Sequence, residues 1–493
     1  MSQDQDSEMK DIPTHKELED AESLEDPSLR QLERETRLRL DILLIPLTLM
    51  LYLLAWLDRA NVGNARVAGM AADLKLSDWE YKTAITVTYV PYILAELPSN
   101  LVLKKIGPRF LLPTLCALWG VVTTLQCKVT SFHGFVACRF FLGMLEGGLF
   151  PGIVLYLSGF YLRHELQVRI ALFFSAASLS GAFSGLLAAA IVKMEGLRGF
   201  RGWQWIFLLE GVFTVCFGLI ALFLLPSEPK DVITFQPRHA ECCVARLQRD
   251  NNHSDKEDEH VTFKQVVSTL LDLHVWLNCA ALFCSGCCLF GLAYFSPSIV
   301  QALGYGTIKT QLLTVPPYAC AFVVTLATAF VADHYKQRGI SALITTSIAL
   351  VGAVMALKGR SVGVRYTALI LLVTGIYSAA PCLISWVPNN SAGHVRRATA
   401  VAMGFISTSI GGVMSTWIYP AKSAPYFELG ARFNLSLIVI AIVLIAAQIL
   451  WLRRLNRIKR DEPERILRGL EGLGFKEQFA MLGDRHPAYR YTY

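Results

Sequence analysis

Two ionisable residues stand inside an apolar stretch and are the first candidates for chemistry. The stretch Cys138–Tyr161 is hydrophobic enough to cross a bilayer, yet it contains Arg139 and Glu146. Because ionisable side chains are costly at membrane depth, their presence there indicates a functional site. They are seven positions apart, which is two helical turns, so they share one helix face about 10 Å apart. Gly143 and Gly147 have the spacing that allows a neighbouring helix to approach closely.

Charge within the predicted spans is concentrated in the N-terminal half of the chain. These intramembrane charges are Asp58, Arg59, Glu96, Arg139, Glu146 and Glu210. We interpret Asp58 and Glu146 as proton carriers, since a carboxyl group that moves between a dry bundle and an arginine takes up or releases a proton. Arg59 and Arg139 can offer planar, two-pronged donors to an anionic substrate. The alternative is a purely structural ion-pair network, which we favour for Glu96 and Glu210.

The predicted depths of two charges suggest a partner for Arg139. In a first span over residues 41–64, Asp58 lies about 9–10 Å from the centre towards the outside. Arg139 lies at a similar depth in the fourth span, which runs in the opposite direction. Because an unpaired buried arginine is costly, Arg139 needs Asp58 or Glu146 close by. We therefore predict that Asp58 and Arg139 pair or exchange partners.

Aromatic and amide side chains are the candidates for the rest of a substrate site. Tyr89 and Tyr92 in the second span and Tyr294 in the seventh are candidate cavity residues, although each could instead pack in the core. Asn389 and Asn390 follow the tenth span and can donate to a carboxylate or accept from a ring nitrogen or an amine. For the asparagines, the alternative is that they only end the helix at its inner mouth.

The elements that must position these residues are long apolar helices. The chain has 493 residues, of which 53% are hydrophobic and 17% charged, and its mean hydropathy is +0.42. A soluble protein would carry about 25% charged residues. Runs such as Ile170–Val192, Thr310–Ala332 and Ala398–Ala421 contain no Asp, Glu, Lys or Arg, and uncharged runs of about 18 residues or more are typical of spanning helices. We predict an all-α polytopic membrane protein.

Twelve predicted spans divide into two six-helix halves. The spans cover residues 41–64, 81–103, 110–128, 134–158, 168–192, 203–225, 273–300, 310–332, 340–358, 365–388, 397–420 and 432–453. The predicted domains are an N-terminal tail (1–40), a first half (41–225), a linker (226–272), a second half (273–453) and a C-terminal tail (454–493). Two halves joined by a long linker are typical of transporters whose halves rock about a central site.

Charge and cysteine content narrow the class further. The net charge of +7 comes largely from basic loop residues, so it indicates membrane topology rather than nucleic-acid binding. The excess of Lys and Arg in alternate loops predicts that both termini lie in the cytoplasm. Most of the twelve cysteines sit in or beside apolar segments, where cysteine behaves as a small hydrophobe. We expect neither a disulfide framework nor a metal site. Residues 1–36 lack the apolar region of a cleavable signal peptide.

Five stretches make the sequence resemble a known family. They are Leu57–Ala65, Pro98–Asn100, Arg139–Gly152, Gly202–Gly211 and Asn389–Ala402. Together they resemble the major facilitator superfamily, and within it the fungal allantoate permease branch of the anion:cation symporters. The known substrates of that branch include allantoate, nicotinate, pantothenate and biotin, usually taken up with protons across the plasma membrane. The resemblance implies protonation at Asp58 and Glu146, and substrate-linked charge at Arg59 and Arg139.

Members of this superfamily share a gating motif that contains a salt bridge, and the resemblance implies a similar motif here. In the first half, the loop Lys104–Arg109 lacks the acidic residue of that motif. In the second half, Asp333 and Arg338 keep the pair, and we expect them to act as gating residues.

These observations lead to one preferred function and two alternatives. We expect a proton-coupled symporter that imports a small organic anion by alternating access, as a monomer in the plasma membrane, with the proton gradient as energy source and no cofactor. We expect no enzymatic activity, since no nucleophile–base pair or His-rich metal cluster occurs at membrane depth. The alternatives are an exporter of a fungal metabolite on the same scaffold and a nutrient sensor that binds without transport.

Overall fold

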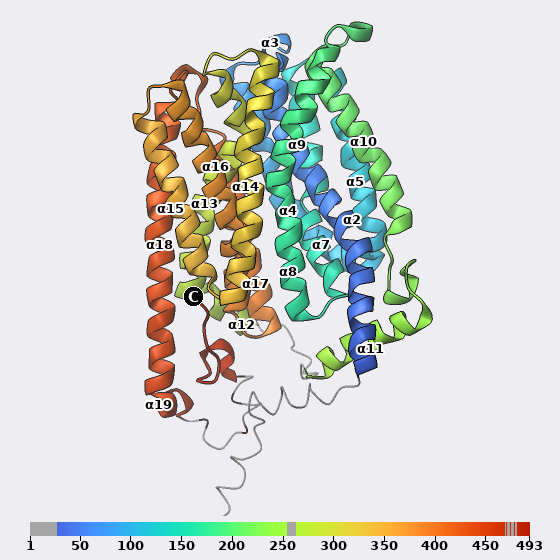
Figure 1. The fold of residues 1–493 in the computed structure, drawn as a ribbon, viewed down its shortest axis with the longest axis vertical. Helices are drawn as coiled ribbons and strands as arrows, with labels where there is room; N and C mark the ends of the chain where they lie inside the picture. The colour runs from blue at the N-terminus through green and yellow to red at the C-terminus, as the bar shows by residue number, and fades with distance from the viewer. Residues whose placement is uncertain (1–26, 254–262, 469, 471–473, 475–477, 479–480) are drawn as a thin grey trace, which may run out of the picture.

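The computed structural model describes residues 27–253, 263–468, 470, 474, 478 and 481–493. These residues form α-helices and short 3₁₀ helices, without a β-strand among them. Figure 1 shows two bundles side by side, the N-terminal one blue to green and the C-terminal one yellow-green to red. The predicted all-α polytopic architecture is therefore confirmed.

The N-terminal half contains six spans, two of which are each divided into two helices. They are α2 (Pro27–Val67), α4 (Asp78–Ile106), α5 (Pro108–Leu125), α6 with α7 (Phe132–Glu146 and Leu149–Ser158), α8 with α9 (Arg163–Phe174 and Ala176–Ile191) and α10 (Gly202–Leu224). The predicted fourth span is thus interrupted directly after Glu146. The first helix begins at Pro27 rather than at residue 41, so part of the predicted tail is helical.

The C-terminal half contains six spans that are single helices. They are α13 (Leu273–Gln301), α14 (Thr307–Tyr335), α15 (Arg338–Lys358), α16 (Val362–Asn389), α17 (His394–Ser415) and α18 (Glu428–Asp461). Among the described residues, eleven helical stretches are long and apolar enough to cross a membrane. The twelfth span by position is α4, whose sequence includes Glu96, several threonines and the two prolines Pro91 and Pro98.

One end of the molecule carries both ends of the described chain. Helix α2 begins there, the linker helices α11 (Pro237–His253) and α12 (Phe263–Leu270) lie there, and α18 is followed there by α19 (Pro463–Leu467) (Figure 1). We call this the terminal end. The opposite end, which carries α3 (Met70–Asp73), is the far end.

The two halves are in direct contact towards the far end. A Cβ atom on Gly63 of α2 would lie 2.4 Å from the backbone oxygen of Tyr294 in α13, so these two backbones touch. The hydroxyl oxygens of Thr86 in α4 and Thr416, which follows α17, are 2.8 Å apart. Contacts this close leave no passage between these helices, and the far end is closed here.

A charged network fixes the linker helix α11 to the terminal end of the N-terminal half. Glu165 of α8 accepts from Arg246 of α11 at 2.5 Å and from Arg37 of α2 at 3.3 Å. Arg169 of α8 binds both carboxylate oxygens of Asp41 in α2, at 2.9 and 2.7 Å. The described part of the linker is therefore packed on the bundle.

Candidate functional site

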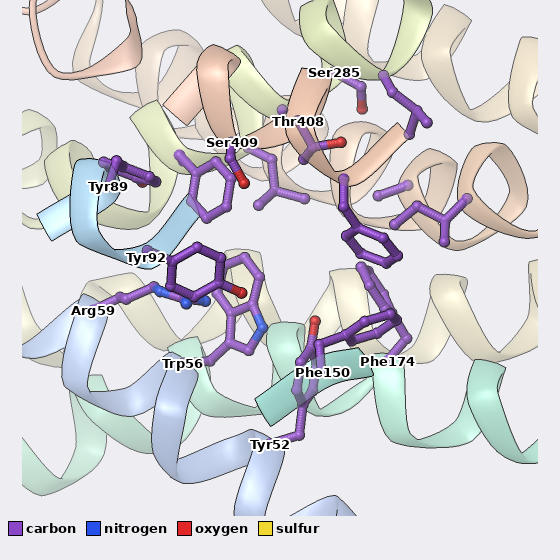
Figure 2. A pocket seen from close by; sticks show the side chains of 17 residues that line it. Tyr52, Trp56, Arg59, Tyr89, Tyr92, Phe150, Phe174, Ser285, Thr408 and Ser409 are labelled. Carbon is purple, nitrogen blue, oxygen red and sulfur yellow. The ribbon is translucent and has the colours of Figure 1, made fainter. Parts of the chain in front are cut away.

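A pocket lies between the two halves, and the empty space in it, open solvent included, is about 600 Å³. Figure 2 shows that both halves contribute side chains to it. Its lining consists of Tyr52, Trp56, Arg59, Tyr89, Tyr92, Phe150 and Phe174 from the N-terminal half and Leu282, Ser285, Gly286, Leu289, Phe290, Ala380, Ile384, Phe405, Thr408 and Ser409 from the C-terminal half. A pocket shared by two halves is the position at which a rocking motion could expose a ligand to either side in turn.

The charged feature of this pocket is a buried ion pair. Arg59 Nη2 donates to Glu146 Oε2 at 3.0 Å, and the two side chains are 9% and 0% exposed. Arg59 of α2 lines the pocket. Glu146, the last residue of α6, binds Arg59 but does not itself line the pocket. The other carboxylate oxygen, Oε1, has no hydrogen-bond partner among the described residues. The pair therefore leaves one oxygen of Glu146 available to carry a proton.

Close packing of α6 against α4 brings Glu146 to this position. A Cβ atom on Gly143 would lie 2.0 Å from the backbone oxygen of Thr88, and one on Gly147 would lie 2.3 Å from that of Tyr92. The predicted role of these two glycines in close helix approach is thus confirmed. Because Tyr92 is also a pocket residue, the same packing sets the position of the carboxylate relative to the pocket wall.

Aromatic rings surround the Arg59 guanidinium. Its Cζ atom lies 5.2 Å from the ring centres of both Trp56 and Tyr92, and 5.9 Å from that of Phe290. Trp56 of α2 is stacked on Phe290 of α13, with ring centres 5.4 Å apart and an interplanar angle of 4°. The electron-rich ring faces stabilise the cation without neutralising it, so Arg59 can still bind an anion.

Asp58 lies next to Arg59 in the chain but does not take part in the ion pair of Arg59 and Glu146. Its Oδ2 atom accepts from Thr123 Oγ1 of α5 at 3.1 Å, and the residue is 2% exposed. Among the described residues it forms no ion pair. A buried carboxyl group that has a neutral donor and no cation in contact is suited to hold a proton.

Arg139 forms no ion pair with Asp58 or Glu146 in this conformation, so whether Asp58 and Arg139 pair or exchange partners during transport stays a prediction. Arg139 is 2% exposed, and its Nε and Nη2 atoms have no hydrogen-bond partner among the described residues. Its Cζ atom lies 5.3 Å from the ring centre of Phe135 and 5.8 Å from that of Phe207. The depth argument considered positions along the helix axes, but contact also depends on the direction of each side chain around its helix.

The three predicted tyrosines gather at the interface between the halves. Tyr89 and Tyr92 of α4 line the pocket. Tyr294 of α13 lies beside it, where its hydroxyl oxygen is 3.3 Å from that of Tyr89. This hydrogen bond joins the two halves. A contact between these residues and a substrate stays a prediction.

Asn389 and Asn390 do not line the pocket, and their predicted place in a substrate site is corrected. Asn390 Nδ2 donates to the Thr492 carbonyl at 3.0 Å, and its Oδ1 accepts from the Thr492 amide at 2.8 Å. The carbonyl oxygen of Asn389 accepts from the Tyr489 hydroxyl at 2.7 Å. Both residues hold the C-terminal segment, residues 481–493, at the terminal end, because this backbone supplies the donors and acceptors that the amide needs.

Asp333 and Arg338 form the predicted ion pair, with Nη2 and Oδ1 2.7 Å apart. Arg338 Nη1 also donates to the backbone oxygen of Ser385 at 3.1 Å, which ties α15 to α16. Both charged residues line a second pocket, to which Ile170 and Phe174 of the N-terminal half contribute as well. Their role in gating stays a prediction.

Several aromatic pocket residues were not singled out from the sequence. Besides Trp56 and Phe290, they include Phe150 of α7 and Phe405 of α17, whose ring centres are 4.3 Å apart across the two halves. Aromatic residues occur in most of the spans, so their type alone does not identify a pocket. The one available signal was that Trp56 precedes Arg59 by three positions and so shares its helix face.

Candidate metal ligands lie at the terminal end, away from this pocket. Ligand atoms of Asp272, His274 and Asp484 lie within 4.8 Å of one another. Arg396 pairs with Asp272 and, at 2.9 Å, with Asp484, while Arg485 pairs with Asp272 at 2.9 Å. Because two guanidinium groups already balance the two carboxylates, a further cation is not favoured there.

Comparison with known sequences gives consistent matches. The chain matches the family described as Major Facilitator Superfamily over residues 48–416. An uncharacterised transporter of Schizosaccharomyces pombe is 34% identical over 440 residues, which cover 89% of this chain and 87% of the relative. The MFS-type transporter efuF of Hormonema carpetanum is 32% identical over 431 residues, covering 87% of each chain. The high-affinity nicotinic acid transporter of Saccharomyces cerevisiae is 31% identical over 477 residues, covering 96% of this chain and 87% of the relative.

Comparison with solved structures shows the fold. A bacterial homologue of the human lysosomal transporter Spinster, in an inward-facing and unoccupied conformation, matches with a TM-score of 0.64 and 14% identity, covering 83% of this chain and 96% of the other. A D-xylose-proton symporter matches with a TM-score of 0.62 and 14% identity, covering 81% of this chain and 96% of the other. At such low identity, these likenesses concern the arrangement of helices alone.

Proposed function

Because the chain belongs to the Major Facilitator Superfamily and is a multi-pass membrane transporter, we propose that it is a proton-coupled symporter that imports a small organic anion. The observation that carries the proposal is the buried pair of Arg59 and Glu146 at the pocket wall. A proton and an anion can both act on this pair, which provides a physical basis for coupling.

Coupling follows from competition for a single guanidinium group. While Glu146 is charged, it holds Arg59 at 3.0 Å, and an incoming carboxylate must compete with it. When Glu146 takes up a proton, its hold on Arg59 weakens, and Arg59 can bind the substrate carboxylate with its planar donors. Proton binding therefore favours substrate binding, and release of the proton favours release of the substrate.

Asp58 and Arg139 supply a second charge exchange in the proposed cycle. In this conformation Asp58 contacts Thr123, and the Arg139 Cζ atom lies 5.3 and 5.8 Å from the ring centres of Phe135 and Phe207. An arginine without a carboxylate partner is costly to keep buried, so a conformation that pairs it with charged Asp58 gains stability. We infer that this pair forms when the far end opens and separates again as Asp58 takes up a proton.

The substrate class is supported by the pocket and by one relative. Arg59 is the cation that lines the pocket among the described residues, while the remaining lining is mainly aromatic, aliphatic and hydroxyl side chains. This combination suits a small carboxylate with an apolar or planar body. A nicotinic acid transporter is among the relatives, and nicotinate has both features. We further propose that the protein acts as a monomer in the plasma membrane, with both termini in the cytoplasm and the far end outside.

Uptake of radiolabelled nicotinate, allantoate, pantothenate and biotin at two external pH values tests this proposal. Cells that express the protein should accumulate at least one of these anions above the level of control cells, and more strongly at the lower pH. A protonophore should abolish the accumulation. Accumulation that ignores the proton gradient would contradict symport, and efflux from preloaded cells without uptake would indicate an exporter.

A further inference from the structure

The N-terminal half contains a third buried carboxyl group that the proposed coupling does not use. Glu210 of α10 is 4% exposed. Its Oε2 atom accepts a hydrogen bond from Asn61 Nδ2, and its Oε1 atom has no partner among the described residues. Glu210 also forms no ion pair within the described part of the chain. A charged carboxylate is expensive in such surroundings, so we expect the neutral acid in this conformation.

A continuous series of hydrogen bonds leads from Glu210 to the other half. Asn61 Oδ1 accepts from Ser184 Oγ of α9 at 3.3 Å, and Ser184 Oγ accepts from Asn64 Nδ2 of α2. The backbone oxygen of Asn64 then accepts from Gln311 Nε2 of α14 at 3.2 Å. These four residues, which we call the polar seam, are each at most 2% exposed.

The last contact of the polar seam depends on closure of the far end. Asn64 belongs to the N-terminal half and Gln311 to the C-terminal half, so their hydrogen bond exists only while the halves are in contact. When the halves separate, Asn64 loses this donor and the interface admits water. Water that reaches Asn64 and Ser184 is then separated from Glu210 only by Asn61, which hydrogen-bonds to both Ser184 and Glu210.

The titratable and charged groups near Glu210 come from helices α2, α6 and α5. Asp58 lies three positions before Asn61 on α2, so these two side chains share one face of that helix. Arg139 of α6 lies over Phe207, one helical turn before Glu210. From α5, the Cys116 thiol donates to the Thr214 carbonyl, one turn after Glu210. Helix α9 presents Ser184 and has no titratable side chain in its described range.

We propose that Glu210 is a third proton-binding carboxyl group, which delivers protons from the far end to Asp58 when the polar seam parts. The proposal rests on the proton-coupled function argued above. In the open state, the Glu210 O–H bond breaks and the proton moves to the Asp58 carboxylate, through intervening water. A hydronium ion from the far end then protonates Glu210 again and is left as water. The two halves can then close at the far end with Glu210 and Asp58 both neutral.

Glu210→Gln tests the proposal directly. Glutamine has the shape and the hydrogen-bonding pattern of the neutral acid but cannot release a proton, so a purely structural role would leave transport unchanged. We expect proton-driven uptake in proteoliposomes to fall at least about tenfold, as for the loss of a group that transfers a proton. Exchange of external for internal substrate at equal pH should stay within about twofold of wild type, since it needs no net proton delivery.

Further variants separate the possible outcomes. Glu96→Gln, which removes another acid of the N-terminal half outside the polar seam, is the matched control and should keep the wild-type pH profile. Glu210→Asp keeps a titratable group, so it should restore proton-driven uptake in part and serves as the test if the glutamine variant does not fold. An unchanged pH profile in Glu210→Gln would overturn the proposal while symport stands. Wild-type uptake that ignores the gradient would instead overturn the proposed function.

Discussion

At the scale of single residues, the two membrane-embedded arginines of the N-terminal half differ in their partners. Arg59 binds Glu146 at 3.0 Å and lines the pocket, whereas Arg139 lies near the rings of Phe135 and Phe207 without a carboxylate in contact. Both are buried, so each pays a similar cost for leaving water. The two arginines are therefore suited to different roles. Arg59 can bind an anion in the pocket, whereas the free-energy cost of burying Arg139 would fall in a conformation that pairs it with a carboxylate.

Replacement of Glu146 by Gln should separate binding from proton coupling. The variant removes the charge that competes for Arg59, so exchange of the anion should persist. Accumulation driven by a pH gradient should fall at least about tenfold, since the proton-binding group is lost. Proteoliposome uptake with and without a gradient measures both activities. Glu165→Gln is the control, because Glu165 is also a buried, ion-paired glutamate but binds Arg246 at the terminal end. Full gradient-driven accumulation by Glu146→Gln would refute its assigned role.

At the scale of elements, direct backbone contact between helices positions the charged residues. Helices α4 and α6 meet where Gly143 has no side chain, which brings Glu146 next to the pocket wall. The C-terminal segment also positions helices, at the terminal end of the molecule. Asn456 of α18 binds the Tyr491 amide at 2.9 Å and its carbonyl at 2.8 Å, and Trp386 of α16 donates to the Thr492 carbonyl at 2.9 Å. This segment therefore ties two helices of the C-terminal half together.

Gly143→Ala should disturb the site without changing any charged residue. The added Cβ atom would lie 2.0 Å from the backbone oxygen of Thr88, so α4 and α6 must move apart. Overpacking of this kind costs about 1–3 kcal/mol, and we expect a lower melting temperature together with at least about tenfold slower uptake. Gly363→Ala is the control, because no atom lies within 4 Å of its added Cβ. Equal stability of the two variants would contradict the tight packing.

Docking of the C-terminal segment should weaken in acid. His486 is buried, and loss of hydration together with the nearby Lys459 ammonium lowers its pKa. The docked state therefore binds a proton less readily than the released state, in which the histidine pKa is about 6.5. Docking should be strongest above about pH 6.5 and lose stability as the pH falls below it.

Limited proteolysis of the C-terminal segment at a series of pH values measures this effect. Cleavage should accelerate below about pH 6.5. His486→Asn is the informative variant, since an amide oxygen can replace Nδ1 as the acceptor for the Ala488 amide but does not titrate. If the variant retains the wild-type pH dependence, His486 is not responsible for it.

At the scale of the whole molecule, the far end is closed by contacts between the halves. Besides the pair of Thr86 and Thr416, Gln311 reaches the Asn64 backbone across the interface. The pocket with Arg59 lies between the same two halves. A rocking motion that opens the far end must break these contacts, and it would expose the pocket to the other side of the membrane.

A covalent link across the far end should therefore stop transport. With Thr86 and Thr416 both replaced by Cys, oxidation should join the halves, because the native hydroxyl oxygens are only 2.8 Å apart. Uptake should fall to the background level and return on reduction. Each single cysteine variant, treated with the same oxidant, controls for the twelve native cysteines. Normal uptake by a fully cross-linked protein would rule out opening at this end.

The sequence by itself determined the fold class, the spans and the charged residues of the N-terminal half. Hydropathy, helix length and the cost of burying charge act within one segment, so they can be read from neighbouring residues. The small residues of the fourth span also predicted close helix packing. A glycine without a side chain allows a helix to approach closely, whichever helix the neighbour is.

Only the tertiary structure decided which groups meet. Glu146 binds Arg59 rather than Arg139, because the direction of a side chain around its helix depends on the packing of α2, α4 and α6. Asn390 holds the C-terminal segment rather than a substrate, because its partner Thr492 lies 102 positions away in the chain. The pocket aromatics and the polar seam join residues from both halves. Such contacts depend on how separate helices are arranged in space, and a pattern within one helix does not contain that information.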